Sequence, residues 1–197
     1  TKPGYLILVN GDLVRNEIVN LVPNVATHAM LNEKIRAAHD LNRSAYAGLR
    51  FVKLLAQGVA TSDAIEPITI FEISGADLLA NQEVTLKEVF GPTAVVVNCQ
   101  SNDEALAIAN AFHGTLASGI HGEASDKIIS LGLLDILVRI SGRVIWNSWP
   151  TGVAVTWSMQ HGGPYPASTN SLFTSVGADS IVRFRRPIVY QNFAENL

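Results

Sequence analysis

The stretch that decides the fold is EVFGPTAVVVNCQSNDEALAIANAF, residues 88–112. Its Gly-Pro pair indicates a turn. The β-branched run Thr93–Asn98 that follows predicts a buried strand. Ser101 fits the N-cap of a helix over Asp103–Phe112, with Glu104 at N3 completing a capping box. The order turn, strand, helix is typical of one βα unit.

The same alternation continues on both sides of this stretch. Further strands are expected over Tyr5–Val9, Ile68–Ile73, Ala117–His121 and Arg143–Asn147. Helical spacing predicts two or three helices between Leu13 and Leu55, one turn of helix or a loop over Ala76–Asn81, and a helix over Ser125–Leu137. Strands that alternate with helices predict parallel pairing with right-handed crossovers. We therefore expect an α/β fold, a three-layer α/β/α domain with a mostly parallel sheet.

Composition limits the partners of the chain. Lys and Arg number 14 against 17 Asp and Glu, a net charge of −3, so there is no basic field for nucleic acid. No apolar run approaches the roughly 20 residues of a membrane span. Charged residues make up only 16% of the chain, where about 25% is usual. Either the chain buries extra surface against partners or part of its protein is missing.

The chain has one cysteine, Cys99, so no intrachain disulfide can form. A single free thiol fits a reducing, cytoplasmic compartment. We expect Cys99 to be buried and structural, because free cysteine is among the most buried residue types. His28, His39, His113 and His121 show no metal-ligand spacing, so no metal is expected.

Two segments near the C-terminus differ from the alternating part. Trp149–Ala167 is rich in Gly, Pro, Trp and Tyr and predicts a long ordered loop, a common carrier of function. Ile181–Tyr190 returns to extended residues with three interleaved arginines. We expect one domain over residues 1–180 and a C-terminal arm over 181–197. The arm is either a solvated edge or a strand that pairs with a neighbouring subunit.

Four segments together resemble the aldehyde dehydrogenase superfamily over essentially the whole chain. Residues 86–92 resemble its Glu-x-Phe-Gly-Pro motif, and Gly142–Asn147 resembles its Gly-x-x-x-x-Asn strand. Pro150–Val153 with His161–Thr169, and the ending 175–193, are similar to the NADP-type branch that includes the α-ketoglutarate semialdehyde (2,5-dioxovalerate) dehydrogenases.

The resemblance implies an enzyme that oxidises an aldehyde to a carboxylate with NADP or NAD. In the family a cysteine thiolate attacks the aldehyde, hydride passes to the nicotinamide, and a glutamate activates the water that completes the reaction. The resemblance places that cysteine immediately before Thr1, and the glutamate further upstream. It therefore implies an inactive C-terminal fragment with no catalytic residue of its own.

The resemblance also assigns binding residues. Glu88 would accept hydrogen bonds from the nicotinamide-side ribose, and Phe90 would pack against that ribose or the ring. Trp149, Trp157 and His161 would help to wall the substrate tunnel. Each of these residues also has a purely structural alternative. Glu88 would then be a solvated residue of a turn, and Phe90 an aromatic residue of the core. The other three residues would only pack within the loop.

Two further expectations concern assembly. By the resemblance, the arm over 181–197 would pair with a partner subunit's sheet, so we expect a homo-oligomer. The rival reading of the chain is a stand-alone α/β module without catalysis, used for binding or assembly.

Overall fold

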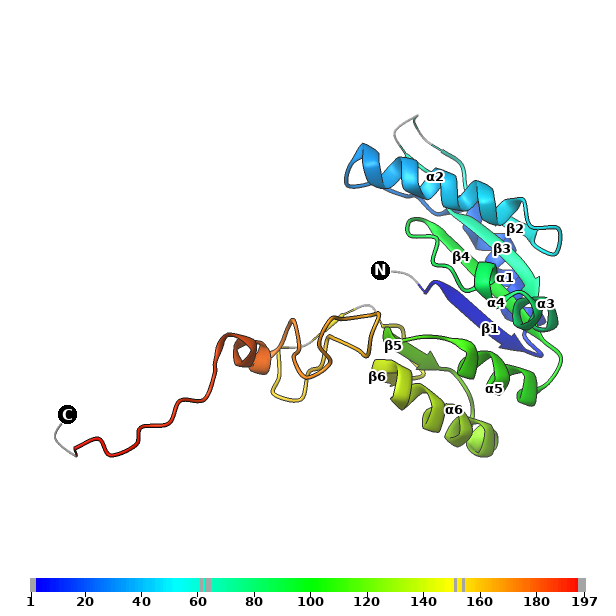
Figure 1. Ribbon diagram of the computed structural model, residues 1–197. Helices are drawn as coiled ribbons and strands as arrows, with labels where there is room; N and C mark the ends of the chain where they lie inside the picture. The colour runs from blue at the N-terminus through cyan, green and yellow to red at the C-terminus, as the bar shows by residue number, and fades with distance from the viewer. Residues whose placement is uncertain (1–2, 61, 63–64, 151, 154, 195–197) are drawn as a thin grey trace. The chain divides into compact units, whose positions relative to one another are not determined.

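The computed structural model describes residues 3–60, 62, 65–150, 152–153 and 155–194 (Figure 1). The chain forms two compact units. The first contains Thr1–Phe112 and Gly122–Ile136, and the second His113–His121 and Leu137–Leu197.

The first unit is built on a four-stranded sheet in the order β1-β4-β3-β2. These strands are β1 (Tyr5–Val9), β2 (Lys53–Gln57), β3 (Thr69–Ser74) and β4 (Thr93–Cys99). β4 lies between β1 and β3 and is parallel to both, whereas β2 is antiparallel at the edge. The mostly parallel α/β sheet expected from the alternating pattern is confirmed.

Helices pack on both faces of this sheet. One face meets α2 (Glu33–Ala47), α3 (Gly75–Ala80) and α5 (Asn102–Ala111), and the core there contains Tyr46, Phe71, Ile73, Leu78, Val95, Val97 and Ile108. The other face meets α1 (Asp12–Leu21), whose Arg15 forms a two-bonded ion pair with Glu72 of β3. The layers of this unit are therefore helix, sheet and helix. The short α4 (Gln82–Thr85) and the 3₁₀ turn η1 (Val22–Asn24) connect these elements.

The caps of α5 differ from the expected capping box by one residue. The Ser101 hydroxyl accepts from the Glu104 amide at 3.2 Å, as predicted. The Glu104 carboxylate, however, accepts from the amide of Gln100 at 2.6 Å, so it satisfies the residue before the N-cap. An acidic residue in the first turn also favours this helix end through the helix dipole.

The structure corrects two expectations about elements. Leu54 and Leu55 belong to β2 and not to a helix, because β3 offers its edge to them as a pairing partner. Ile181–Phe184 belongs to the 3₁₀ helix η3 (Ala178–Phe184) and is not extended. An alternating pattern yields a strand only where another strand supplies hydrogen bonds, and β-propensity therefore depends strongly on context.

The second unit contains a parallel pair, β5 (Thr115–Ile120) and β6 (Ser141–Trp146). The 3₁₀ turn η2 (Ala124–Asp126) and α6 (Lys127–Ile140) precede β6. A Cβ on Gly142 would lie 1.8 Å from the Gly162 carbonyl oxygen, and one on Gly163 would lie 2.3 Å from the Thr115 carbonyl oxygen. Only glycine allows this close approach, so the segment around residues 162–163 packs directly on the strands.

Among the described residues of 147–177 there is no helix or strand, as the Gly- and Pro-rich composition of Trp149–Ala167 predicted. Residues 185–194 also lack both and are exposed.

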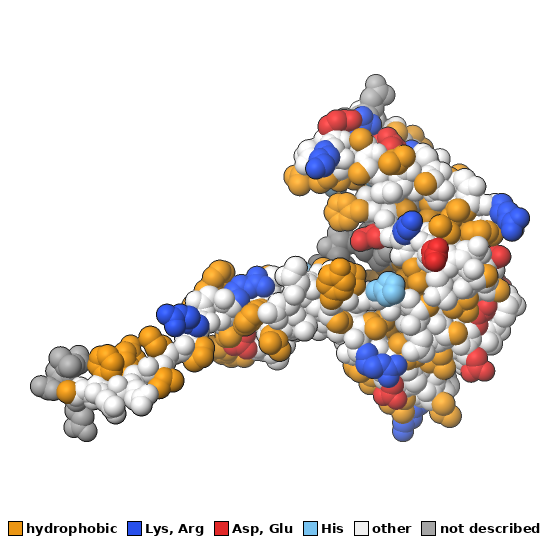
Figure 2. All heavy atoms as spheres, viewed as in Figure 1, with side chains coloured by type: hydrophobic (Ala, Val, Ile, Leu, Met, Phe, Trp, Pro, Cys, Tyr) orange, Lys and Arg blue, Asp and Glu red, His pale blue; other side chains and the backbone are white. Residues whose placement is uncertain are grey.

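Large apolar side chains remain exposed on both units. α1 has no buried residue, and Leu13 is 83% exposed. Apolar side chains occupy much of the visible surface, with few charges between them (Figure 2). This exposure follows from the low share of charged residues. Within the described part of the chain, no helix has the length and apolarity to cross a membrane.

Candidate functional site

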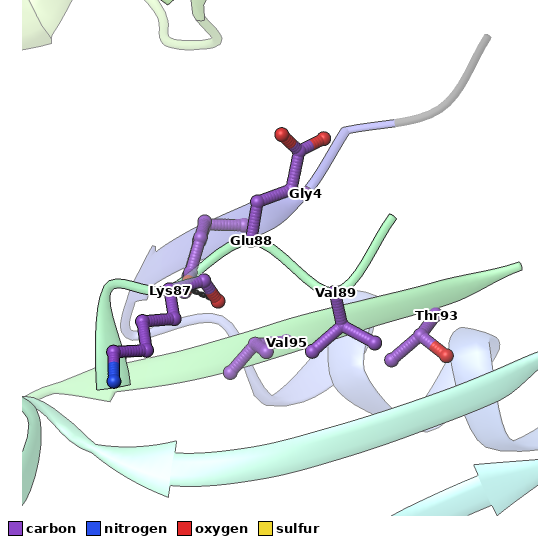
Figure 3. A pocket seen from close by; sticks show the side chains of 7 residues that line it. Gly4, Lys87, Glu88, Val89, Thr93 and Val95 are labelled. Carbon is purple, nitrogen blue, oxygen red and sulfur yellow. Dashed lines mark hydrogen bonds between the residues drawn. The ribbon is translucent and has the colours of Figure 1, made fainter. Parts of the chain in front are cut away.

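The segment between α4 and β4 carries the two expected cofactor-binding residues. Its side chains alternate: Val89 is buried, whereas Glu88 is exposed and Phe90 is 64% exposed. Figure 3 shows Val89 pointing toward Val95 and Thr93 of β4, while the Glu88 carboxylate points away from the sheet. Val89 therefore fixes the segment to the sheet, and its two neighbours face outward.

The Glu88 carboxylate forms no hydrogen bond or ion pair with the described residues. It borders a hollow of about 10 Å³ between the start of β1 and this segment, room for a single water molecule. A ligand that reaches Glu88 would therefore lie on the outer surface. An unpaired, exposed carboxylate has all its lone pairs available for hydroxyl donors.

The hydroxyl of a half-buried tyrosine holds the start of this segment. The Tyr5 hydroxyl of β1 donates to the carbonyl oxygen of Thr85 at 2.6 Å, and the Lys87 carbonyl oxygen lies 3.2 Å from it. Tyr46 of α2 also points at the Thr85 carbonyl, at a longer 3.4 Å. Burial, followed by the neighbouring Tyr46 and Glu88, raises the pKa of Tyr5 well above its usual value, so it stays protonated at neutral pH.

A histidine holds the end of the segment. His39 of α2 is 1% exposed, and its Nε2 lies 2.8 Å from the Thr93 hydroxyl. Gly91 has a φ of +140°, and a Cβ there would lie 2.5 Å from the His39 Cδ2. The ring therefore occupies the space that a side chain at position 91 would need. Neither Tyr5 nor His39 lies in a recognisable sequence motif, so the sequence gives no local signal for this role.

His39 also belongs to a cluster with Asp40 and Glu66, whose polar atoms lie within 4.8 Å of one another. Two guanidinium groups neutralise the carboxylates: Arg43 lies 2.8 Å from Asp40, and Arg36 lies 3.5 Å from Glu66. The hydrogen bond from Arg43 lowers the pKa of Asp40. Because cations already face both carboxylates, this arrangement is an ion-pair network and does not call for a metal ion.

Cys99 is buried at the end of β4, as expected. Burial, and to a lesser degree Glu104, raises the pKa of its thiol to about 12. The thiol is therefore protonated at neutral pH, and only a thiolate is an effective nucleophile.

The three expected substrate-contact residues all lie in the second unit. His161 is held through its backbone: its amide donates to the Thr174 hydroxyl at 2.9 Å, and its carbonyl accepts from the Ser175 hydroxyl at 2.7 Å. The His161 Nδ1 lies 3.3 Å from the same Ser175 hydroxyl. The residue thus joins two parts of the irregular segment.

Trp149 and Trp157 are more exposed than His161. Trp149 is 51% exposed and packs on the His121 ring, with centroids 4.9 Å apart at 42°. Trp157 is 75% exposed and has no ring contact among the described residues. Glu88 and Phe90 thus face outward from the same short segment. The contact of Trp149, Trp157 and His161 with substrate stays a prediction.

Comparison with known proteins agrees with the motifs. The family model described as "Aldehyde dehydrogenase family" matches residues 53–177. The chain is 36% identical over 201 residues to alpha-ketoglutaric semialdehyde dehydrogenase 2 of Azospirillum brasilense. It is 32% identical over 202 residues to alpha-ketoglutaric semialdehyde dehydrogenase of Acinetobacter baylyi. Each alignment covers 100% of this chain and 38% of the relative.

Solved structures show the same fold at lower identity. Proline utilization A from Bdellovibrio bacteriovorus superposes with a TM-score of 0.73 and 20% identity, over 92% of this chain and 19% of that one. A putative aldehyde dehydrogenase from Burkholderia cenocepacia superposes with a TM-score of 0.65 and 18% identity, over 82% and 35% of the two chains.

Proposed function

The chain belongs to the aldehyde dehydrogenase family, and from this premise we propose that it forms part of an enzyme that oxidises an aldehyde to a carboxylate with NADP or NAD. Because the chain spans 38% of the length of the two curated relatives, the remaining parts of such an enzyme lie outside it. Both relatives are named for α-ketoglutaric semialdehyde, which supports a semialdehyde such as 2,5-dioxopentanoate as substrate.

The observation that carries the proposal is the outward-facing pair Glu88 and Phe90. When bound, the nicotinamide accepts the hydride that leaves the aldehyde carbon. The free Glu88 carboxylate can accept from both hydroxyls of a ribose, and a charged acceptor strengthens these bonds. The exposed Phe90 ring offers an apolar face for the ribose or the nicotinamide. A charged acceptor beside an exposed apolar ring fits the ribose and nicotinamide of the cofactor.

Trp149, Trp157 and His161 would contribute to the wall of the substrate tunnel. Exposed aromatic rings give such a wall an apolar lining. The backbone bonds of His161 to Thr174 and Ser175 would hold that part of the wall in place.

This chain by itself offers no nucleophile for the reaction. Its one cysteine, Cys99, is buried and protonated. We therefore expect the purified chain to form no NADPH or NADH from short, long or semialdehyde substrates. Aldehyde-dependent turnover that disappears in Cys99→Ala would contradict this expectation.

The test of the cofactor assignment is Glu88→Gln in the enzyme expressed from the complete reading frame. A misplaced nicotinamide should slow single-turnover hydride transfer, by up to about 10²-fold. Alkylation of the nucleophilic thiol should proceed at its normal rate. Glu83→Gln is the matched control, since Glu83 is an exposed carboxylate on the nearby α4. Unchanged hydride transfer in Glu88→Gln would refute the assignment.

The alternative is a stand-alone α/β module for binding or assembly, in which a buried Cys99 is equally expected. The reading frame before Thr1 distinguishes the two. A Gly-Gln-x-Cys segment preceded by a dinucleotide-binding domain supports the enzyme, and a start site there supports the module.

We also propose that the protein is a cytoplasmic homo-oligomer that associates through the arm over 181–197. The described part of this arm is exposed, with Phe184 at 84% and Val189 at 86%. Exposed apolar residues on an unpaired segment favour pairing with another chain. Light scattering of the chain with and without residues 181–197 tests this. A monodisperse monomer at micromolar concentration would refute it.

A further inference from the structure

The segment that carries Glu88 and Phe90 is supported at both ends by side chains from distant parts of the chain, one half-buried and one buried. Tyr5 of β1 holds its start and His39 of α2 holds its end. We infer that Tyr5 and His39 are positioning residues that set the directions in which Glu88 and Phe90 present themselves to the dinucleotide. This inference rests on the proposed function.

The directions of the Glu88 and Phe90 side chains depend mainly on the backbone of their segment. Among the described residues, the exposed Glu88 carboxylate forms no hydrogen bond or ion pair, and the largely exposed Phe90 ring stacks on no other ring. A side chain without such contacts points where its backbone directs it, within its rotamers. Groups that fix the backbone here therefore fix the binding geometry.

Tyr5 acts on the peptide plane before Glu88. The Lys87 carbonyl and the Glu88 amide belong to one planar peptide group. The Tyr5 hydroxyl shares its one hydrogen between the carbonyls of Thr85 and Lys87, at 2.6 and 3.2 Å, and thereby restricts rotation of the peptide plane from which Glu88 begins. Tyr5 is itself fixed in place. The residue pairs with Val95 in the sheet, and its ring packs edge-on against the Phe112 ring with centroids 5.0 Å apart.

His39 acts on the residue after Phe90. Its ring lies against Gly91, where the backbone turns with a φ of +140°. The 2.8 Å contact between His39 Nε2 and the Thr93 hydroxyl ties the ring to the first residue of β4. The turn that directs Phe90 outward is thus held between the sheet and a buried ring.

The first test is Tyr5→Phe in the enzyme from the complete reading frame, because this change removes only the hydroxyl. We expect the dissociation constant of NADP or NAD, measured by calorimetry, to rise about 5- to 10-fold, the usual effect of one lost hydrogen bond. Hydride transfer should slow, while the KM for aldehyde and thiol alkylation stay unchanged. Tyr46→Phe is the matched control: this buried hydroxyl points at the Thr85 carbonyl from 3.4 Å, and no bond from it reaches Lys87.

A double mutant separates positioning from general stability. If Tyr5 acts through Glu88, then Tyr5→Phe should weaken dinucleotide binding no further in a Glu88→Gln background. An equal loss in both backgrounds overturns the inference. No effect of Tyr5→Phe, where Glu88→Gln does weaken binding, overturns it and leaves the proposed function standing. No effect of Glu88→Gln overturns both.

Thr93→Val tests the second support, because it removes the hydroxyl that holds the His39 ring and keeps the side-chain shape. The dissociation constant of the dinucleotide should rise by a similar factor, and this rise should vanish in a Phe90→Ala background. A rise that persists without the Phe90 ring means that His39 does not act through Phe90, which overturns this half of the inference.

Discussion

Replacing Gly91 by alanine should destabilise the first unit strongly, for two reasons that the structure separates. The backbone at Gly91 has a φ of +140°, a region that costs an L residue about 1–3 kcal/mol. The new Cβ would also lie 2.5 Å from Cδ2 and 2.9 Å from Cγ of His39. Because His39 is 1% exposed, its ring cannot move aside without disturbing the core. Overpacking of this kind costs about 1–3 kcal/mol.

The two effects together predict a loss of about 2–6 kcal/mol, a large part of the usual 5–15 kcal/mol of domain stability. Urea denaturation of the 197-residue chain, followed by far-UV circular dichroism, measures this loss. Tryptophan fluorescence is unsuitable, since all three tryptophans, at positions 146, 149 and 157, lie in the second unit.

Gly4→Ala is the control, because a Cβ at Gly4 would meet no atom within 4 Å. We expect it to change the free energy of unfolding by less than about 0.5 kcal/mol. His39→Ala should relieve the contact part of the Gly91→Ala loss, so the double variant should be more stable than the sum of the single losses by about 1–2 kcal/mol. A loss in Gly91→Ala no larger than in Gly4→Ala would refute the reasoning.

Two further predictions concern ionisable groups. Cys99 should resist thiol reagents at pH 8 until urea unfolds the chain, because burial raises its pKa to about 12. The raised pKa stabilises the fold fully below the pKa of an unfolded cysteine, about 8.5, and this contribution is lost as the pH rises above it. The free energy of unfolding should therefore fall between pH 9 and 12, and the fall should be smaller in Cys99→Ala. The Arg15 hydrogen bond lowers the pKa of Glu72 below 4.5, so the pair stabilises the fold above that pH and less as the pH falls. Arg15→Gln should cost about 1 kcal/mol at pH 7, discounted for partial exposure, and less at pH 3, as urea denaturation at both pH values would show.

The segment around Glu88 and Phe90, with its supports Tyr5 and His39, shows which residues could be predicted from the sequence. Glu88 and Phe90 are recognisable because they sit in a short contiguous motif, and their exposure agrees with a binding role. Tyr5 and His39 could not be found in this way. Each acts on residues more than 50 positions away, through contacts that exist only after the sheet has formed.

Local patterns determined the elements whose signals are local. The β-branched run predicted β4, and Ser101 with Glu104 predicted the start of α5, because propensity and capping depend on neighbours in the chain. Only the tertiary structure decided that Leu54 and Leu55 form a strand and that Ile181–Phe184 form a 3₁₀ helix. The physical reason is that a strand depends on hydrogen bonds from a partner elsewhere in the chain, which β3 provides for β2 and which local sequence does not encode.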